Sequence, residues 1–124
     1  MDLNGENCSI CVGEIGLTGI VEVAGEVDVA TVSMLAKALG DAVTSGAGDI
    51  LLDAQQLTYI DSAGIQTLLS TQRALGEKNR RFAIIGCHGV FQKILETASL
   101  TDRFAMYPTV DEALTELGRS ASPG

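Results

Sequence analysis

Hydrophobic and polar residues alternate near the start of the chain in a way that indicates β-strands. Residues 9–15 and 18–25 have this pattern and are joined at Gly16-Leu17. In the second segment Val21 and Val23 fall on one face, because successive side chains of a strand point to opposite sides. The two segments therefore predict a β-hairpin.

The following segment changes to a helical period. From Val32 onward, apolar side chains of residues 31–44 fall at i, i+3, i+4, i+7 and i+11, which places them on one face of a helix. Similar apolar stripes occur over residues 62–78 and 90–98. A capping box at residues 109–112 predicts the start of a fourth helix.

Short apolar runs separate the helical segments. Residues 49–54 and 81–86 have the composition of strands covered on both faces, and residues 103–107 predict a short edge strand. The predicted order is β-β-α-β-α-β-α-β-α. Strands that alternate with helices imply right-handed crossovers. We therefore predict an α/β fold with a mixed, mostly parallel β-sheet, an N-terminal β-hairpin and about four helices.

The length of 124 residues is enough for one domain with a single core. We expect a flexible N-terminus at residues 1–8, a folded domain at residues 9–117 and a flexible C-terminal tail at residues 118–124. The start of the chain lacks the layout of a signal peptide. No apolar run approaches the roughly 18 residues of a membrane helix. A cytoplasmic protein without membrane contact is expected.

Charge is distributed unevenly along the chain. The formal net charge is -8, and Lys37 is the only basic residue before Arg73. Proteins that bind nucleic acids need basic side chains to neutralise phosphates, so direct binding to DNA or RNA is not expected. A protein partner fits this charge better.

The three cysteines do not indicate a disulfide framework or a metal site. Cys8 and Cys11 have C-x-x-C spacing, and Cys87 lies far from them in the sequence. In an extended strand, three positions span about 10 Å and end on opposite faces, which is too far for a disulfide. We expect no metal and no cofactor, while a redox role for these thiols stays open.

Three segments lead from a predicted strand into a predicted helix, at residues 25–28, 61–64 and 86–89. Such loops gather at one edge of a parallel sheet, where partners bind. Ser62 begins the second helix. Unpaired backbone N–H groups and the helix dipole favour an anion there, so a phosphate on this hydroxyl is accommodated easily. Alternatively, Asp61 or Ser62 is only the helix N-cap.

The segment Gly25-Glu26-Val27-Asp28 together with Ile60-Asp61-Ser62-Ala63-Gly64-Ile65 resembles the anti-sigma factor antagonist family, whose members share the STAS domain. The similarity extends from about residue 10 to residue 117 and implies a STAS domain at residues 9–117. The chain departs from the family pattern at Ala63, where serine or threonine is common, and at Gln66, where glycine is frequent.

The resemblance implies a non-enzymatic regulator of transcription and stress responses that switches between partners. The unphosphorylated protein binds an anti-sigma factor, which is a serine kinase of the histidine-kinase-like ATPase fold, and a sigma factor is released. Phosphorylation of Ser62 ends this binding, and a serine phosphatase restores it. The implied partner-binding residues are Glu26, Asp28, Asp61, Ser62, Ala63, Gly64, Ile65 and Gln66.

Other functions fit parts of the same pattern. A STAS accessory or signalling module would bind a transporter or stress-complex partner without a phosphorylation cycle. A serine hydrolase would use Ser62, His88 and one acid, although the chain has no G-x-S-x-G motif. Clustered carboxylates of Glu26, Asp28 and Asp61 would suit Mg²⁺.

Overall fold

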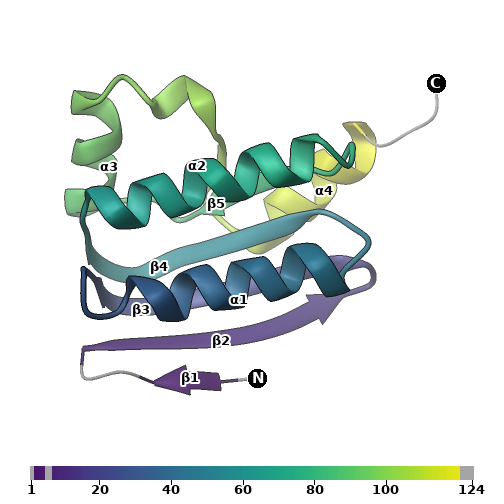
Figure 1. Ribbon diagram of the computed structural model, residues 1–124. Coiled ribbons are helices and arrows are strands. Elements are labelled where there is room, and N and C mark those ends of the chain that lie inside the picture. The colour runs from purple at the N-terminus through teal and green to yellow at the C-terminus, as the bar shows by residue number, and fades with distance from the viewer. Residues whose placement is uncertain (1, 5–6, 121–124) are drawn as a thin grey trace.

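The computed structural model describes residues 2–4 and 7–120 (Figure 1). In chain order the elements are β1 (Asp2–Asn4), β2 (Cys8–Ile15), β3 (Thr18–Val27), α1 (Val32–Ser45), β4 (Ile50–Ile60), α2 (Ser62–Gly76), β5 (Phe82–Ile85), α3 (Gly89–Thr97), the 3-10 helix η1 (Thr101–Arg103), β6 (Ala105–Tyr107) and α4 (Val110–Ser120). This order adds one strand, β1, to the predicted series. Across the described residues, no helix is both long and apolar enough to cross a bilayer.

The strands form one six-stranded sheet in the order β1-β2-β3-β4-β5-β6. The first three strands pair antiparallel, and β3, β4, β5 and β6 pair parallel. Because each parallel connection passes through a helix, the carboxyl ends of β3, β4 and β5 all lie at the same end of the molecule. Over the described residues, the predicted α/β fold with a mixed, mostly parallel sheet, an N-terminal hairpin and about four helices is confirmed.

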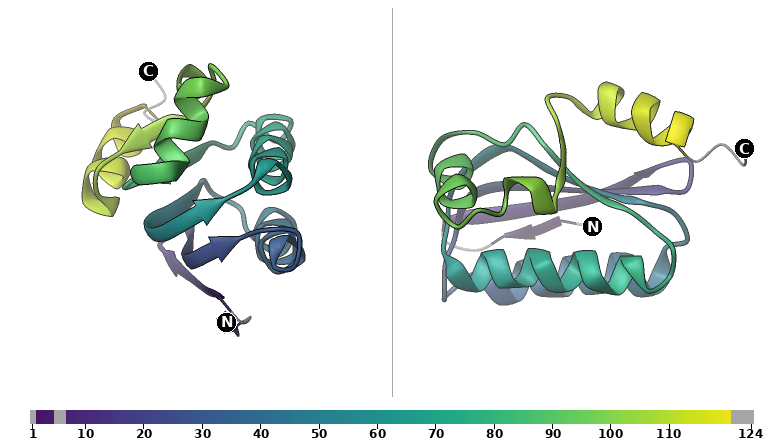
Figure 2. Two further views of the ribbon diagram at one scale, coloured as in Figure 1. Left: turned by 90° about the vertical axis from the view of Figure 1, so that its left-hand side faces the viewer. Right: turned by 90° about the horizontal axis from the view of Figure 1, so that it is seen from above.

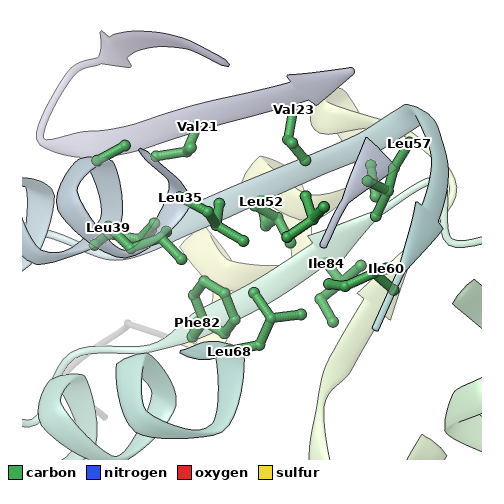
Figure 3. Close-up of a cluster of buried hydrophobic side chains, with 14 of the residues drawn as sticks. Val21, Val23, Leu35, Leu39, Leu52, Leu57, Ile60, Leu68, Phe82 and Ile84 are labelled. Carbon is green, nitrogen blue, oxygen red and sulfur yellow. The ribbon is translucent and has the colours of Figure 1, made fainter. Parts of the chain in front are cut away.

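Helices cover both faces of the sheet. Figure 2 shows α1 and α2 side by side on one face, α4 on the other face, and α3 across one end. The larger core lies beneath α1 and α2, where Leu35 and Leu68 pack over Leu52 and Ile84 (Figure 3). The smaller core lies under α4 and contains Leu51, Ala83, Ile85, Ala113 and Leu117. Covering on both faces explains the unbroken apolar run at the start of β4.

The strand β4 is longer than the predicted residues 49–54 and reaches Ile60. The pairing of β3 with β4 shifts register twice, between Glu22 and Ala24 and between Gly25 and Glu26. Beyond position 54, only every third residue is buried, up to Ile60. The irregular pairing removes the alternation on which a strand prediction depends.

At both ends of the domain, the structure describes elements inside the segments that are expected to be flexible. Asp2–Asn4 forms β1 and pairs with residues 9–11 of β2, although residues 1–8 are predicted to be flexible. A three-residue strand is too short to show a pattern in the sequence. The helix α4 continues past residue 117 to Ser120. The remaining residues of both predicted tails, 1, 5–6 and 121–124, lie outside the described residues.

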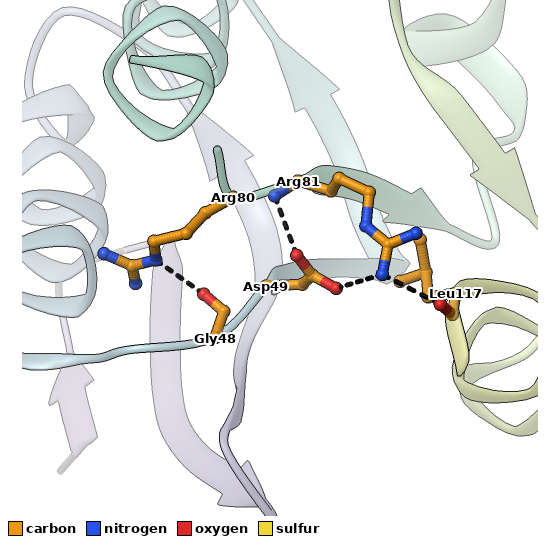
Figure 4. A network of polar contacts seen from close by, with 5 residues as sticks. All are labelled: Gly48, Asp49, Arg80, Arg81 and Leu117. Carbon is orange, nitrogen blue, oxygen red and sulfur yellow. Dashed lines mark hydrogen bonds and ion pairs between the residues drawn. The ribbon is translucent and has the colours of Figure 1, made fainter. Parts of the chain in front are cut away.

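A polar network joins the elements at the end of the sheet where β4 begins (Figure 4). The Arg81 side chain donates to Asp49 Oδ2 and to the carbonyl oxygen of Leu117, both at 2.8 Å. The Arg81 backbone N–H donates to Asp49 Oδ1, also at 2.8 Å. Arg80 Nε donates to the carbonyl oxygen of Gly48 at 2.7 Å. These bonds tie the start of β4 to α4.

Candidate functional site

The carboxyl ends of β3, β4 and β5 lie at the left of Figure 1, where the chain enters α1, α2 and α3. Val27 pairs with Ile60 at the end of the β3–β4 ladder. The backbone N–H of Asp61 donates to the carbonyl oxygen of Val27 at 3.0 Å, which joins the two strand-to-helix segments directly. One boundary differs from the prediction, because residues 25–27 still belong to β3 and the loop begins at Asp28.

Asp61 is the N-cap of α2, and Ser62 is the first residue of the helix. The Asp61 Oδ1 atom accepts a hydrogen bond from the Gly64 backbone N–H at 3.1 Å, which satisfies a donor left open at the helix start. Ser62 is exposed, and its hydroxyl has no hydrogen bond to any described residue. Ala63 is half-buried, and Gln66 is exposed. Asp61 therefore performs the capping and leaves the Ser62 hydroxyl accessible.

Gly64 allows the first turn of α2 to approach the ends of β3 and β4. A Cβ atom at this position would lie 2.4 Å from Ile60 Cγ1 and 3.0 Å from Val27 Cγ1. Ile65 beside it is 5% exposed. The resemblance implies that Gly64 and Ile65 bind a partner, but both are buried because this side of α2 packs against the sheet. Their packing against the sheet holds the first turn of α2, and with it Ser62, in place.

Asp28 orders the loop between β3 and α1. Its Oδ1 atom accepts hydrogen bonds from the backbone N–H groups of Ala30 at 2.9 Å and Thr31 at 3.2 Å. The Thr31 hydroxyl donates to the carbonyl oxygen of Glu26 at 3.0 Å. Asp28 thus closes a turn that directs the chain into α1. This structural role was not apparent from the sequence.

The surroundings of Ser62 are acidic. Asp61 precedes it directly, and the hydrogen bond from Asp61 brings the segment with Glu26 and Asp28 alongside. None of these three carboxylates is ion-paired within the described residues, whose salt bridges join other side chains. A further negative charge at Ser62 would therefore add to an existing negative field.

Exposed apolar side chains at the same end of the fold were missed by the sequence analysis. Val29, in the loop after β3, is 83% exposed, and Tyr59, near the end of β4, is 39% exposed. Val90 in the first turn of α3 is 46% exposed, although the helical period groups it with the buried Phe91. Apolar residues in a turn are the signal that would have identified Val29.

The geometry offers little support for the two alternatives of a serine hydrolase and a magnesium site. His88 Nε2 lies 2.9 Å from the carbonyl oxygen of Gln55, and no hydrogen bond joins His88 to Ser62 among the described residues. A nucleophile needs its base within hydrogen-bonding reach. Within residues 2–4 and 7–120, no group of three or more His, Cys, Asp or Glu side chains is gathered as metal ligands would be.

The cysteines lie as their spacing predicts. Cys8 is 4% exposed and Cys11 is exposed, so they point to opposite faces of β2. Burial raises the pKa of the Cys8 thiol, and burial also raises the pKa of Cys87 to about 11. Both of these thiols are protonated at neutral pH, which makes them weak nucleophiles.

The sequence matches a known family over most of its length. Residues 10–113 match the family model described as "STAS domain". The anti-sigma-F factor antagonist RsfB of Mycobacterium tuberculosis is 21% identical over 110 residues, which cover 89% of this chain and 89% of that protein. The anti-sigma-B factor antagonist of Staphylococcus aureus is 30% identical over 82 residues, which cover 66% and 76%.

Solved structures have the same architecture. An anti-sigma factor antagonist from Mycobacterium paratuberculosis superposes with a TM-score of 0.81 at 25% identity, covering 92% of this chain and 97% of that one. Unphosphorylated SpoIIAA, an anti-sigma factor antagonist, gives 0.77 at 20% identity, covering 89% and 96%. Bacillus SpoIIAA in its phosphorylated form gives 0.69 at 18% identity, covering 87% and 98%. The chain therefore belongs to the STAS domain family and is a relative of anti-sigma factor antagonists.

Proposed function

We propose that this protein is an anti-sigma factor antagonist that is switched off by phosphorylation of Ser62. The unphosphorylated form binds an anti-sigma factor in the cytoplasm, and a sigma factor is released. The anti-sigma factor is a serine kinase of the histidine-kinase-like ATPase fold that phosphorylates Ser62, and a serine phosphatase restores the binding form. The protein itself contacts neither nucleic acid nor membrane.

The observation that carries this proposal is the accessibility of the Ser62 hydroxyl. Asp61 supplies the cap of α2, so the hydroxyl is not needed to hold the helix start. A kinase can therefore reach Ser62 without unfolding the helix. The resemblance assigns the acceptor role to the same serine.

A phosphate on Ser62 is compatible with the fold. Ser62 is at the first position of α2, where the helix dipole and the backbone N–H groups favour a negative charge. We expect the modified protein to keep its structure. SpoIIAA, which has been solved in unphosphorylated and phosphorylated forms, supports this expectation.

The switch acts through charge. Phosphorylation adds roughly -1.5 to -2 charges at neutral pH, beside the Asp61 carboxylate. A partner that covers Ser62 would have to bury this charge unpaired, at a cost of ~3–5 kcal/mol, as for buried ion pairs that lose one member. At about 1.4 kcal/mol for each tenfold change, the affinity falls by hundreds-fold or more.

We name the surface around Ser62 the acceptor face; it comprises Glu26, Asp28, Val29, Asp61, Ser62, Ala63 and Gln66. Its charged members are acidic, and Val29 exposes apolar area. Apolar anchors supply binding energy, while charges set specificity and the rate of association. A partner with a basic and apolar surface fits the acceptor face.

The test is a calorimetric titration of the purified cognate anti-sigma factor with four forms of the protein. It measures the affinity of each form. We expect the wild type and Ser62→Ala to bind alike, and Ser62→Glu to bind at least about a hundredfold more weakly. Ser45→Glu is the matched control, because Ser45 is exposed at the opposite end of α1. This control should stay within about twofold of the wild type.

Two results would contradict the proposal. One is equal affinity of the wild type, Ser62→Ala and Ser62→Glu for the anti-sigma factor. The other is incorporation of phosphate by Ser62→Ala, measured by mass spectrometry after incubation with the kinase and ATP, at the same rate as by the wild type.

A further inference from the structure

A polar hollow lies between α2 and η1, apart from the start of α2. Its volume is about 410 Å³, and it is lined by Gln66, Leu69, Ser70, Gln72, Arg73 and Arg103. Five of these six side chains are polar, and two of them are cationic. The hollow contains no acidic residue.

Two arginines line the same hollow in a protein that is acidic as a whole. The protein has 16 acidic and 8 basic residues, yet Arg73 and Arg103 come from positions 30 apart to line one hollow. Both are exposed, and neither guanidinium forms a hydrogen bond or ion pair with another described residue. By contrast, Arg81 is paired with Asp49. Two unpaired arginines and no acidic residue among the lining residues give the hollow itself a positive charge on an acidic protein.

The position of Arg103 is fixed by its neighbours. The Gln72 side-chain amide donates to the backbone carbonyl of Arg103, and the Arg103 N–H donates to the carbonyl oxygen of Leu100 at 2.9 Å. The next residue, Phe104, is 5% exposed and packs edge-on against Phe82 with ring centroids 6.2 Å apart. The backbone that carries Arg103 is therefore held against α2 before any ligand binds.

The hollow continues the acceptor face along α2. Ser62, Gln66 and Ser70 are four residues apart and share one side of the helix, which Arg73 extends by a further turn. Arg73 lies eleven positions after Ser62, or about 16 Å along the axis. Gln66 belongs to both surfaces. A single protein seated on this side of α2 would cover the acceptor face and the hollow.

We propose that the hollow binds an acidic segment of the same protein that docks on the acceptor face, with its carboxylates on Arg73 and Arg103. This proposal rests on the proposed function and specifies the chemistry of its partner. The guanidinium group is a planar fork that pairs with a carboxylate through two hydrogen bonds. Acidic side chains beside Ser62, and the two arginines of the hollow between α2 and η1, give the surface opposite charges at its two ends. Such a pattern fixes the orientation of a partner.

The experiment compares two double variants that each remove two positive charges. Arg73→Gln with Arg103→Gln removes the cations of the hollow, whereas Lys37→Gln with Lys78→Gln removes exposed cations elsewhere. Affinity for the purified cognate anti-sigma factor is measured at about 50 mM and about 300 mM NaCl. We expect the arginine variant to bind at least about tenfold more weakly at low salt, with a smaller loss at high salt. The lysine variant should remain within about twofold of the wild type.

Further variants separate this proposal from the proposed function. If Ser62→Glu abolishes binding while the arginine variant binds like the wild type, the hollow has no such role and the switch stands. Arg73→Lys with Arg103→Lys keeps the charge but loses the fork, and an affinity between those of the wild type and the glutamine variant supports carboxylate pairing. If inorganic phosphate or ATP at millimolar concentration binds the isolated protein at these arginines, the hollow is a small-anion site, and the proposal is overturned.

Discussion

The two ends of β4 both carry charged side chains, but they use them differently. Where β4 begins, Asp49 and Arg81 bind each other, and the Arg81 guanidinium also donates to the carbonyl oxygen of Leu117 (Figure 4). Where β4 ends, the Asp61 side chain accepts a hydrogen bond only from the start of its own helix, and the Ser62 hydroxyl has no partner among the described residues. The charged side chains at the start of β4 are therefore paired with each other, whereas the Asp61 carboxylate at its end has no ion pair within the described residues.

The comparison shows how residues of one chemical class divide between stability and binding. A partly buried carboxylate that accepts bonds from several donors contributes to folding, because removing it leaves those donors unsatisfied. A carboxylate that caps one helix and otherwise faces solvent contributes less to folding and remains able to influence a partner. The first end should therefore respond to substitution mainly in stability, and the second mainly in binding.

The largest expected loss of stability comes from Asp49→Ala. The substitution removes both bonds to Arg81, which leaves the backbone N–H without an acceptor and the guanidinium with only the Leu117 carbonyl oxygen, so we expect a loss of about 2–3 kcal/mol in the free energy of unfolding. Urea denaturation measures it, and the folded variant should still bind the anti-sigma factor. Asp41→Ala is the control, because the Lys37–Asp41 pair is exposed and contributes at most about 0.5 kcal/mol. Equal losses of unfolding free energy for the two variants would show that the partly buried Asp49–Arg81 pair stabilises the fold no more than the exposed Lys37–Asp41 pair does.

Gly64→Ala tests the support beneath Ser62. The added Cβ would lie 2.4 Å from Ile60 Cγ1, and a packed core resists such an insertion with a loss of about 1–3 kcal/mol. Gly76→Ala is the matched control in the same helix, since a Cβ there meets no atom within 4 Å. This control should stabilise the protein by about 0.5–1 kcal/mol. Thermal unfolding of both variants would show opposite shifts, and a stabilised Gly64→Ala protein would contradict the close approach of α2 to the sheet.

Substitutions at Asp61 separate its capping role from its charge. Asp61→Ala removes the acceptor for the Gly64 N–H and should cost about 1 kcal/mol of stability. Asp61→Asn keeps an acceptor and should cost only a few tenths of a kcal/mol. Chemical denaturation compares the two. Identical losses would mean that the charge of Asp61, and not its hydrogen bond, stabilises α2.

The smallest effect concerns the thiol of Cys87. Its pKa is raised by burial to about 11 from the ordinary value of 9.0. The unfolded chain therefore loses this proton at lower pH than the folded protein, and the contribution of Cys87 to stability is complete below pH 9 and lost as pH rises through about 11. Denaturation between pH 8 and 11 should show this decline in the wild type and less of it in Cys87→Ala. An equal decline in both proteins would contradict the assignment.

The order of elements was predictable because each helix and most strands have a clear period. The end of β4 was not, because the register shifts against β3 leave Leu57 and Ile60 buried without alternation. The sequence also identified Ser62 as the start of a helix, but it left open whether Asp61 or Ser62 is the cap. Only the hydrogen bond from Gly64 to Asp61 decides between them.

The features that the sequence did not predict depend on contacts between residues far apart in the chain. The pairing of Asp49 with Arg81 spans 32 positions, and the hollow joins Arg73 to Arg103 across 30. No local pattern in a single sequence encodes such pairs, because they arise from the way the sheet and helices assemble. The exposure of Val90 also depends on assembly, because the helical period alone groups it with the buried Phe91.

The most direct test of the account uses authentic phosphoserine at position 62. The affinity of the anti-sigma factor is measured for the modified and unmodified proteins, and their melting temperatures are compared in the same buffer. We predict that phosphorylation lowers the affinity by hundreds-fold while the melting temperature stays nearly unchanged, because the acceptor is exposed at a helix start. Undiminished binding, or loss of binding only through unfolding of the protein, would contradict a switch based on charge at this surface.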